Sequence, residues 1–465
     1  MTTTTREETP NRVWHVARGV PVSGEERSFG SGAGRFVTPA LDLDALVWPR
    51  TEPGPAFDTP VAEIMDVLVE LGSWLGRDPD GLVAGALAAA RRTNPLPAGV
   101  LTEAYASLGR TFDRRAMEFM IEQELGGPDV LDGWRTITAA PSGRPVRVRA
   151  FPARVVHVLA GNAPGVGAVS LLRAALTKGV NLFKLPSNDL YSTSLLLAGL
   201  HAVAPGHPTT RSCSAAYWRG GDAEVESVLF RPQFFDKLAA WGGEASLRSA
   251  RAYVGPGFEL VSFDPKTSVS LIGREAFVSA AAVAEAAEAA AKDIMLMDQQ
   301  ACAASRFQYV EGSAEDADRF AAALLPRLGV ARRLGSAVGN PVPAEIRAEV
   351  EALRELAPYA RVFGGYDGHG LVVRTEEPVD FHPEHKVANV VPVDRLEDAL
   401  GRINVATQSV GVFPASRKAS LRDALAAAGA QRIVTLGDVP IVEAGLPHDG
   451  FYPLQRLVRW VSDEG

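Results

Sequence analysis

Cysteine is scarce in this sequence: only Cys213 and Cys302 occur among 465 residues, and they lie far apart. Two distant cysteines exclude the disulfide framework of many secreted proteins and favour a reducing cytoplasm. The N-terminal stretch MTTTTREETPNR has no apolar run of the kind that signal peptides contain, and no run of 18 or more apolar residues occurs anywhere. We therefore expect a cytoplasmic protein without a membrane span.

The chain also has no excess of basic residues. Lysine and arginine total 47 against 55 aspartates and glutamates, so the net charge of -8 gives no electrostatic footprint for nucleic acid or an anionic membrane. Hydrophobic residues make up 46% of the chain, which is ample for full cores. The length favours two or three domains at roughly 150 residues each. These features are typical of a globular enzyme.

Residue periodicity divides the first part of the chain into two zones. Residues 1–60 are rich in turn formers, and the four prolines in WPRTEPGPAFDTP exclude a long helix there, so we expect an extended leader. From Val61 to about Leu125 apolar residues recur every three or four positions, which predicts several amphipathic helices.

Alternating strand and helix patterns follow. RVVHVLAG and VNLFKLPS are short apolar runs rich in β-branched residues, and GVGAVSLLRAALTKG between them has helical spacing. They predict a βαβ unit, which crosses over right-handed and brings its loops to the carboxyl edge of a parallel sheet, where ligands bind. The pattern over 195–243 predicts a second such unit. The expected fold class is therefore α/β, with a nucleotide-sized crevice.

Cys302 is predicted to lie in a loop. The alanine-rich run over 280–291 favours a helix, and RFQYVEG, which follows the cysteine, alternates like a strand. A structural cysteine would sit more comfortably inside one of these elements, so the stretch QQACAASR leaves open that Cys302 is a nucleophile. Cys213 lies in a strand pattern and is expected in the core.

The glycine-containing loop AGNAPGVG joins a strand to a helix, so its backbone amides can face an anion or a developing oxyanion. Its glycines do not match the GxGxxG fingerprint, and a tight turn is the plainer interpretation. Asn162 in this loop can donate from its side-chain amide to a carbonyl oxygen, with an Asx turn as the alternative. The pair Gly242 and Gly243, after a later strand, is equally compatible with an ordinary turn.

Four segments of the chain are distinctive together: VVHVLAGNAPGVGAVSLLRAALTKGVNLFKLPSND, PKTSVSLIG, QQACAASRFQYV and LPHDGFYPLQRLVRWV. In this order and spacing they resemble the acyl-CoA reductase family, which includes the LuxC-like fatty acid reductases and belongs to the aldehyde dehydrogenase superfamily. The resemblance runs from about residue 60 to the C-terminus. It implies an aldehyde dehydrogenase-like fold with N-terminal helices and a Rossmann-type parallel-sheet cofactor domain, together spanning 61–275. An α/β catalytic domain is expected over 276–440, with 441–465 returning to the domain interface.

The resemblance implies roles for two catalytic residues. Cys302 matches the catalytic cysteine, whose thiolate attacks the carbonyl of an acyl thioester and becomes acylated, a step for which a thiol is well suited. Asn162 matches the asparagine that forms an oxyanion hole with the backbone amide of the nucleophile. The stretch PHDG (447–450) resembles a family hallmark and is expected near the active site, with a simple turn as the alternative.

The same resemblance implies a nicotinamide cofactor. Lys184 stands where a lysine contacts the adenosine ribose, and Ser187, with its neighbour Asn188, lies close to the position that decides the choice of nicotinamide. A glutamate there would repel a 2'-phosphate whereas serine would not, so NADPH is expected and NADH stays an alternative. Gly242 and Gly243 are expected in the cofactor-binding loop.

The stretch FHPEHK (381–386) allows two interpretations. In the superfamily a glutamate near this region holds the nicotinamide ribose, and Glu384 or His385 is the nearest match. His382 and His385 lie three residues apart, but no third or fourth ligand is spaced around them. We therefore predict a cofactor contact here and no metal site.

One departure from oxidising aldehyde dehydrogenases is informative. Those enzymes carry a glutamate in a Glu-Leu-Gly-Gly-Lys pattern, which activates the water that hydrolyses the acyl enzyme. Here SFDPKTS places Ser262 at that position, although Glu259 lies three residues upstream and a shifted alignment stays open. Without this base, the acyl enzyme should resist water and be reduced by hydride or passed to a thiol.

The expected function is NAD(P)H-dependent reduction of an acyl thioester, long-chain acyl-CoA or an acyl carrier protein thioester, to the aldehyde through acyl-Cys302. The first alternative is an aldehyde dehydrogenase that oxidises an aldehyde to the acid or to acyl-CoA. A non-catalytic nucleotide-binding partner and acyl transfer without hydride chemistry are further alternatives. Superfamily members usually associate through arms or strands, so the resemblance also implies a homo-oligomer.

Overall fold

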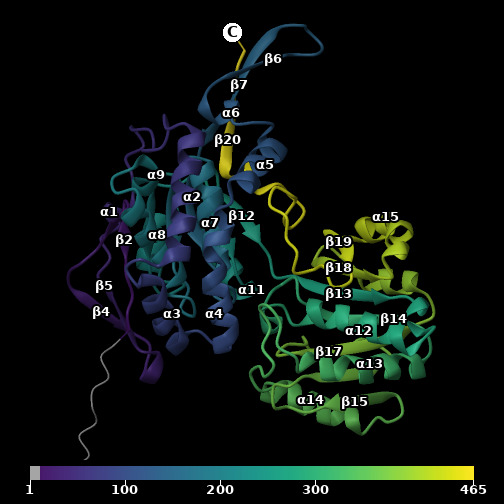
Figure 1. The fold of residues 1–465 in the computed structure, drawn as a ribbon. Coiled ribbons are helices and arrows are strands. Elements are labelled where there is room, and N and C mark those ends of the chain that lie inside the picture. Colours follow the sequence, from purple (N-terminus) through teal and green to yellow (C-terminus); the bar gives the residue numbers. More distant parts are fainter. Residues whose placement is uncertain (1–10, 465) are drawn as a thin grey trace, which may run out of the picture.

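The computed structural model describes residues 11 to 464, which form two large lobes and a projecting arm (Figure 1). Each lobe is built on a seven-stranded sheet, and two three-stranded sheets complete the structure. None of the helices in the described part of the chain is long and apolar enough to cross a membrane.

The first lobe contains a parallel sheet in the strand order β12-β11-β8-β9-β10. Strands β8, β9 and β10 are buried at every position, as parallel strands covered by helices require, while the edge strand β12 is only partly buried. They are β8 (Arg154–Val158), β9 (Val180–Lys184), β10 (Cys213–Ala216), β11 (Lys237–Trp241) and β12 (Glu259–Phe263). The connecting helices are α7 (Gly165–Leu176), α8 (Ser192–Val203), α9 (Pro208–Arg211), α10 (Ala223–Leu229) and α11 (Glu244–Arg251). The predicted βαβ units are both present.

Amphipathic helices cover one side of this sheet. In α2 (Val61–Arg77) the apolar stripe that includes Leu68 and Leu71 is fully buried, and the helix packs on α7 and α8 (Figure 1). The other helices of the layer are α3 (Leu82–Thr93), α4 (Ala98–Ser107), α5 (Arg114–Leu125) and α6 (Asp129–Asp132). The helices predicted between 61 and 125 are thus confirmed.

The part of the predicted leader that the structure describes is more ordered than expected. It holds the short helix α1 (Leu43–Leu46) and five short strands: β1 (Asn11–Arg12), β2 (Val16–Ala17), β3 (Val20–Pro21), β4 (Glu26–Phe29) and β5 (Phe36–Pro39). Strand β2 pairs antiparallel with β10, because the outer edge of β10 would otherwise leave its backbone groups unpaired. Strands β2 and β3 therefore extend the first sheet, and β1, β5 and β4 form a small sheet of their own, while residues 1–10 lie outside the described chain.

The second lobe has the strand order β15-β16-β17-β14-β13-β18-β19, with all neighbours parallel except the antiparallel edge strand β15. The strands are β13 (Thr267–Ile272), β14 (Ser305–Glu311), β15 (Ala360–Gly364), β16 (Leu371–Thr375), β17 (Val387–Val393), β18 (Thr407–Phe413) and β19 (Arg432–Thr435). Helices α12 (Ala280–Ile294), α13 (Ala314–Leu328), α14 (Ala344–Arg354) and α15 (Lys418–Ala428) accompany them. Because β13 lies inside this sheet, between β14 and β18, the lobe begins between β12 and β13, earlier than the predicted boundary at 275.

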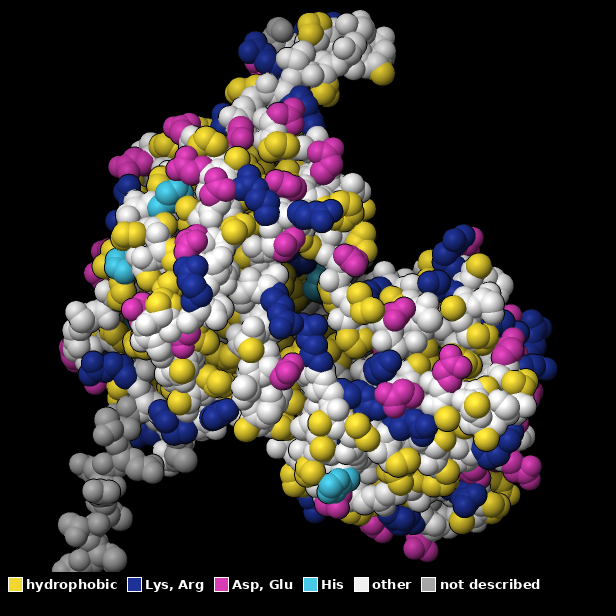
Figure 2. All heavy atoms as spheres, in the orientation of Figure 1, with side chains coloured by type: hydrophobic (Ala, Val, Ile, Leu, Met, Phe, Trp, Pro, Cys, Tyr) yellow, Lys and Arg dark blue, Asp and Glu magenta, His cyan; other side chains and the backbone are white. Residues whose placement is uncertain are grey.

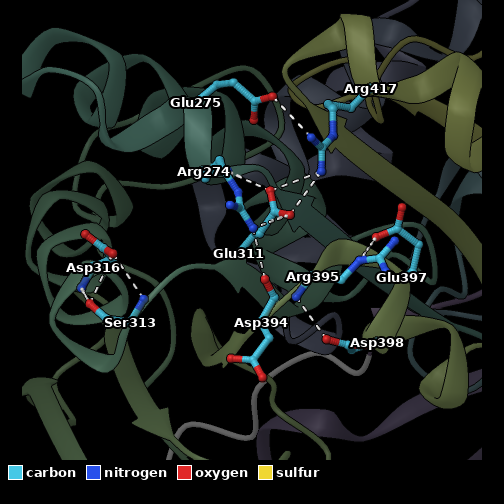
Figure 3. Close-up of polar contacts among 10 residues, drawn as sticks. All are labelled: Arg274, Glu275, Glu311, Ser313, Asp316, Asp394, Arg395, Glu397, Asp398 and Arg417. Carbon is cyan, nitrogen blue, oxygen red and sulfur yellow. Dashed lines mark hydrogen bonds and ion pairs between the residues drawn. The ribbon is translucent and has the colours of Figure 1, made fainter.

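A group of ion pairs lies at the carboxyl end of the second sheet. The buried carboxylate of Glu311, at the end of β14, accepts hydrogen bonds from Arg274 and Arg417, each at 3.1 Å (Figure 3). Cys302 precedes β14 and therefore lies at the other end of this sheet. That amino end faces the first lobe.

The C-terminal segment links the two lobes. Asp293 on α12 accepts hydrogen bonds from the backbone amides of Gly437 and Val439, and Glu124 on α5 accepts one from Leu454 at 2.6 Å. After α16 (Pro453–Leu457), strand β20 (Val458–Asp463) pairs with β7 (Pro145–Pro152), which also pairs with β6 (Arg135–Thr138). These three strands form the arm at the top of Figure 1.

Candidate active site

Cys302 follows a short turn of unusual backbone conformation. Met297, Asp298 and Gln299 have φ of 55°, 48° and 68°, in the left-handed region that costs an ordinary residue roughly 1–2 kcal/mol. Three consecutive residues of this kind persist only where the surroundings hold them, and such strain gathers at functional sites.

Hydrogen bonds from both sides hold the turn. The fully buried side chain of Gln299 donates to the carbonyl of Val387 at 2.7 Å and accepts from its amide at 3.1 Å, as an added strand would. The Ser336 amide donates to the carboxylate of Asp298 at 2.6 Å. The Ser268 hydroxyl donates to the carbonyl of Cys302 at 3.0 Å. The backbone beside the sulfur is therefore fixed to the second sheet.

The two cysteines occupy different environments. Burial and the nearby Asp449 carboxylate raise the pKa of Cys302, while hydrogen bonds from Gln408 and from backbone amides at 302 and 303 lower it. Cys213 lies within β10, where burial alone raises its pKa to about 12. Cys302 is half-exposed in a loop, as expected, and has donors directed at its thiolate, whereas Cys213 is an inert core thiol.

Asn162 reaches the nucleophile from the other lobe. Its Nδ2 donates to the carbonyl of Gln300 at 2.8 Å, two residues before Cys302. This bond crosses between the lobes, so the amide does not serve a local Asx turn. A primary amide carries two hydrogens, and this bond uses one of them.

Glu259 is not placed to activate a water beside the thiol. It begins β12 and is bound by Lys237 at 2.6 Å and by Arg456 at 2.6 Å. The carboxyl ends of the first sheet face the nucleophile, as Asn162 after β8 shows, so the start of β12 lies at the opposite edge. Ser262, nearer the carboxyl end of β12, is half-buried.

The PHDG stretch places a carboxylate near Cys302. Asp449 accepts a hydrogen bond from Nε2 of Gln408 at 3.0 Å, and burial raises the pKa of Asp449 to about 6. The neighbouring His448 ring packs edge-on against Trp241 at 5.3 Å and lies 3.3 Å from Arg173. Burial and the charge of Arg173 lower the pKa of His448 to about 3, so this imidazole is neutral.

The expected cofactor residues lie at the carboxyl edge of β9. Lys184 ends the strand and is buried, with its Nζ 5.6 Å from the centre of the Trp218 ring, and burial lowers its pKa. Ser187 is exposed and Asn188 is half-buried. A Cβ on Gly161 would lie 1.8 Å from Oδ1 of Asn188, so Asn188 closes directly on the loop that carries Asn162.

A groove with features of a nucleotide site follows β11. Gly242 has φ of 155°, Gly243 is the N-cap residue of α11, and an open surface depression lies over the first turns of that helix. Glu226 lies beside Lys184, and its buried carboxylate interacts with Trp218, the Gly221 amide and Tyr253. A buried carboxylate beside Lys184 suits a sugar hydroxyl, so Lys184 and Glu226 fit the adenosine part of a nicotinamide dinucleotide. The negative charge of Glu244 at the start of this helix would repel a phosphate group, but Arg248 forms an ion pair with Glu244 and offsets that charge.

The FHPEHK stretch lies beside the turn that precedes Cys302. His385 and Gln300 both line a cavity of about 90 Å³, and the charge of half-buried Glu384 acts on Arg306, which donates to the carbonyl of Gln299. His382 is exposed. Between residues 11 and 464 no group of three histidine, cysteine or acidic side chains is arranged to hold a metal ion.

A family model described as acyl-CoA reductase (LuxC) matches residues 60–460. The chain belongs to this family. The long-chain acyl-protein thioester reductases of Photorhabdus laumondii and Aliivibrio fischeri are each 32% identical to it, over 74% and 76% of this chain and 70% and 71% of theirs. A solved aldehyde dehydrogenase 21 from Physcomitrella patens aligns with a TM-score of 0.71 at 15% identity over 98% of each chain. An NADP-dependent enzyme from E. coli aligns with a TM-score of 0.73 at 16% identity over 97% and 98%.

In this acyl-CoA reductase family member, the family resemblance and the aldehyde dehydrogenase-like fold expected from sequence are confirmed. The structure brings Asn162 to the loop of Cys302 and places Lys184, Ser187 and Asn188 at the same carboxyl edge of the first sheet, at the end of the neighbouring strand β9. Sequence reasoning missed Gln408, for which no local signal exists. Asp449 was signalled only by the PHDG hallmark.

Proposed function

We propose that this chain reduces an acyl thioester to the aldehyde through an acyl group carried on Cys302. The observation that carries the proposal is the meeting of a donor-surrounded thiol on the second lobe with the Asn162 amide of the first. The family match and the names of the relatives, long-chain acyl-protein thioester reductases, support a long-chain acyl group bound to a protein or to CoA.

Acyl transfer begins with attack by the Cys302 thiolate on the thioester carbonyl. The oxygen then becomes negative, and the free hydrogen of the Asn162 amide together with the backbone amide of Cys302 would donate to it. Preorganised donors of this kind contribute about 3 kcal/mol each. The new bond joins the Cys302 sulfur to the carbonyl carbon, and the bond from that carbon to the sulfur of the substrate breaks, so the substrate thiol leaves and the acyl group stays on Cys302.

A bound nicotinamide dinucleotide supplies the hydride that turns the acyl group into an aldehyde. Lys184, Ser187, Asn188, Gly242 and Gly243 would hold its adenosine and phosphate parts. NADPH is the preferred form because exposed Ser187 presents no carboxylate to a 2'-phosphate, with NADH as the alternative.

The nicotinamide ribose would lie near the turn before Cys302, where Glu384 and His385 are candidate contacts. Figure 2 shows the surface hollowed between the lobes, with Lys and Arg side chains gathered along the hollow. This charge suits the phosphates of a dinucleotide and of CoA. We further propose a cytoplasmic homo-oligomer, as is usual in this superfamily.

Oxidation of an aldehyde to the acid is the second candidate, and the Asp449 carboxylate near Cys302 favours it, since such a group can activate water. The two candidates differ in the lifetime of the acyl enzyme. Reduction requires an acyl group that survives in water until hydride reaches it, whereas oxidation requires rapid hydrolysis.

Intact-protein mass spectrometry after mixing with a long-chain acyl-CoA tests the proposal. Wild type should gain the acyl mass, keep it for minutes in buffer, and lose it as aldehyde when NADPH is added, faster than with NADH. Cys302→Ala should gain no mass, while Cys213→Ala, the matched control, should behave as wild type because Cys213 is buried in β10. An adduct on Cys302→Ala, or an adduct that hydrolyses within seconds, would overturn the proposal.

A further inference from the structure

Residues 448–451 form a tight turn beside the active site. The backbone amide of His448 donates to the carbonyl of Phe451 at 2.9 Å, and the amide of Phe451 donates to the carbonyl of His448 at 3.1 Å. The two central residues, Asp449 and Gly450, have φ of 51° and 82°, as in a type I′ turn, a conformation that Asp-Gly pairs favour. The local sequence therefore suits this turn, which fixes the directions of the His448 and Asp449 side chains.

His448, the first residue of the turn, contacts the first lobe. The centre of its imidazole ring lies 5.3 Å from that of the Trp241 ring and 5.4 Å from that of the Phe263 ring, edge-on to both. Its Nδ1 lies 3.3 Å from Nη2 of Arg173 on α7, and because a guanidinium only donates, the imidazole nitrogen is the acceptor. Trp241 ends β11, which pairs with β8, the strand that precedes the Asn162 loop. His448 is thus anchored one strand away from that loop.

Asp449, the next residue, contacts the second lobe. Its Oδ1 accepts a hydrogen bond from Nε2 of Gln408 on β18 at 3.0 Å, and its side chain is only 5% exposed. The neighbouring amide of Ser409 donates to the Ser268 hydroxyl at 3.1 Å, and this hydroxyl donates to the carbonyl of Cys302 at 3.0 Å. The Asp449 side chain is therefore anchored to the strands that hold the nucleophile loop.

Two consecutive residues of the turn thus contact opposite lobes, each close to a catalytic residue. Asn162 on the first lobe and Cys302 on the second must keep a fixed separation, so that the amide meets the oxyanion while the sulfur forms its bond. We infer that Asp449 is a positioning residue that keeps Cys302 opposite Asn162. Its bond to Gln408 holds the second lobe against the turn, and the His448 contacts hold the turn to the first lobe. The inference rests on the proposed function and adds to it.

This role requires a hydrogen-bond acceptor at position 449 and not a negative charge. Asp449→Asn keeps an acceptor, the Oδ1 of the amide, whereas Asp449→Gly removes it, and both variants remove the charge. The pairs Asn-Gly and Gly-Gly also adopt type I′ turns, so both variants suit the backbone conformation of the turn. The comparison between them therefore isolates the bond to Gln408.

The test measures the rate of acyl-Cys302 formation from a long-chain acyl-CoA by rapid-quench mass spectrometry. We expect Asp449→Asn to react within about threefold of wild type and Asp449→Gly about 10- to 10²-fold more slowly, because a misplacement of about 1 Å can cost roughly 10²-fold. Iodoacetamide, which needs no oxyanion donor, should alkylate Cys302 at the same rate in both variants. Glu443→Gly, the matched control at an exposed position of the same segment, should react like wild type. Equal acylation rates of Asp449→Asn and Asp449→Gly would overturn the inference.

A double variant tests whether Asp449 acts through the alignment of Asn162. In wild type, Asn162→Ala should slow acylation by about 10²- to 10³-fold, but in the Asp449→Gly background it should cost less than about tenfold, because the donor is already misplaced. The full cost of Asn162→Ala in that background would show that Asp449 does not position this pair, and would overturn the inference.

Gln408→Leu breaks the same bond from the second lobe and keeps the inference testable if Asp449→Gly fails to fold. It should slow acylation by a similar factor and should likewise reduce the cost of Asn162→Ala to less than about tenfold. A normal acylation rate in Gln408→Leu would contradict the role of Asp449. Absence of any wild-type adduct would instead refute the proposed function, and this inference with it.

Discussion

Asn162 joins the two lobes at the nucleophile through one side chain, and a second asparagine offers a comparison. Nδ2 of Asn340 donates to the carbonyl of Pro95 at 2.8 Å, the same length as the bond from Asn162 to Gln300. The bond from Asn162 links the first sheet to the second lobe, and the bond from Asn340 links the second lobe to the helical layer. Asn162 bonds Gln300, two residues before Cys302, whereas Asn340 bonds Pro95 of the helical layer, so variants of the two residues compare a proposed role at the thiol with cohesion of the lobes.

Asn162→Ala should slow acylation of Cys302 by about 10²- to 10³-fold, because one oxyanion donor is lost. Asn340→Ala should change that rate by less than about threefold. Rapid-quench mass spectrometry of the acyl enzyme measures both. A comparable loss in the two variants would mean that Asn162 acts by holding the lobes together.

At this scale the sequence was informative where the signal was local. The small residues around Cys302, between a predicted helix and a predicted strand, indicated an accessible thiol, and the AGNAPGVG loop indicated an amide near it. Gln408 carries no such signal, because a glutamine in an apolar strand looks like any half-buried polar residue. Its role depends on Asp449, which only the tertiary fold brings alongside.

Among the secondary-structure elements, α2 and α8 pack unusually closely. A Cβ on Gly199 of α8 would lie 2.6 Å from Cδ1 of Leu71 and 2.9 Å from the Trp74 ring, both on α2. The absence of a side chain thus lets the helical layer approach the first sheet. Gly85 of α3 has no atom within 4 Å of its missing Cβ and is exposed.

Gly199→Ala should lower the free energy of unfolding by about 1–3 kcal/mol, since the added methyl overpacks a filled interface. Gly85→Ala should raise it by about 0.5–1 kcal/mol, because alanine restricts the unfolded chain in an open helical position. Urea titration followed by circular dichroism measures both changes. Stabilisation by Gly199→Ala would show that α2 and α8 have room to move apart.

Elements with strong periodicity were predictable, and elements defined by their partners were not. The buried stripe of α2 and the apolar runs of β8 and β9 repeat at helical and strand spacing, so they were found. The two-residue strand β2 of the leader has no period of its own and is defined by its pairing with the edge of β10. Strands β12 and β13 are separated by only three residues yet belong to different sheets. The boundary between the lobes therefore has no loop or linker that the sequence pattern could reveal.

On the scale of the whole molecule, the segment that links the lobes is held at each end by a buried carboxyl group. Asp293 holds it to the second lobe and Glu124 to the first. Burial raises the pKa of Glu124 from 4.5 to about 7, although the Leu454 amide and Arg173 act against this, and burial raises the pKa of Asp293 to about 7. Both groups therefore bind protons more tightly when the chain is folded.

This sign gives a stability that falls as pH rises. The contribution of Glu124 is fully present below pH 4.5 and is lost as pH rises through about 7, because the folded state holds the proton that the unfolded state has released. Glu124→Gln mimics the protonated form and removes this loss. Its stability relative to wild type should therefore increase by about 1–3 kcal/mol between pH 5 and pH 8. Urea titrations at both pH values measure the stability difference between Glu124→Gln and wild type. If this difference does not change with pH, a group other than Glu124 causes the pH dependence.

The order in which the site is completed follows from the position of the linking segment in the chain. The ribosome makes residue 302 well before residue 449, and strand β20, which pairs with β7, is made later still. During synthesis the second lobe therefore exposes the Cys302 thiol before Asp449 has been made and before β20 completes the arm. A chain cut short before Gly437 would carry this thiol without the Asp449 carboxylate and without the segment that ties the two lobes together.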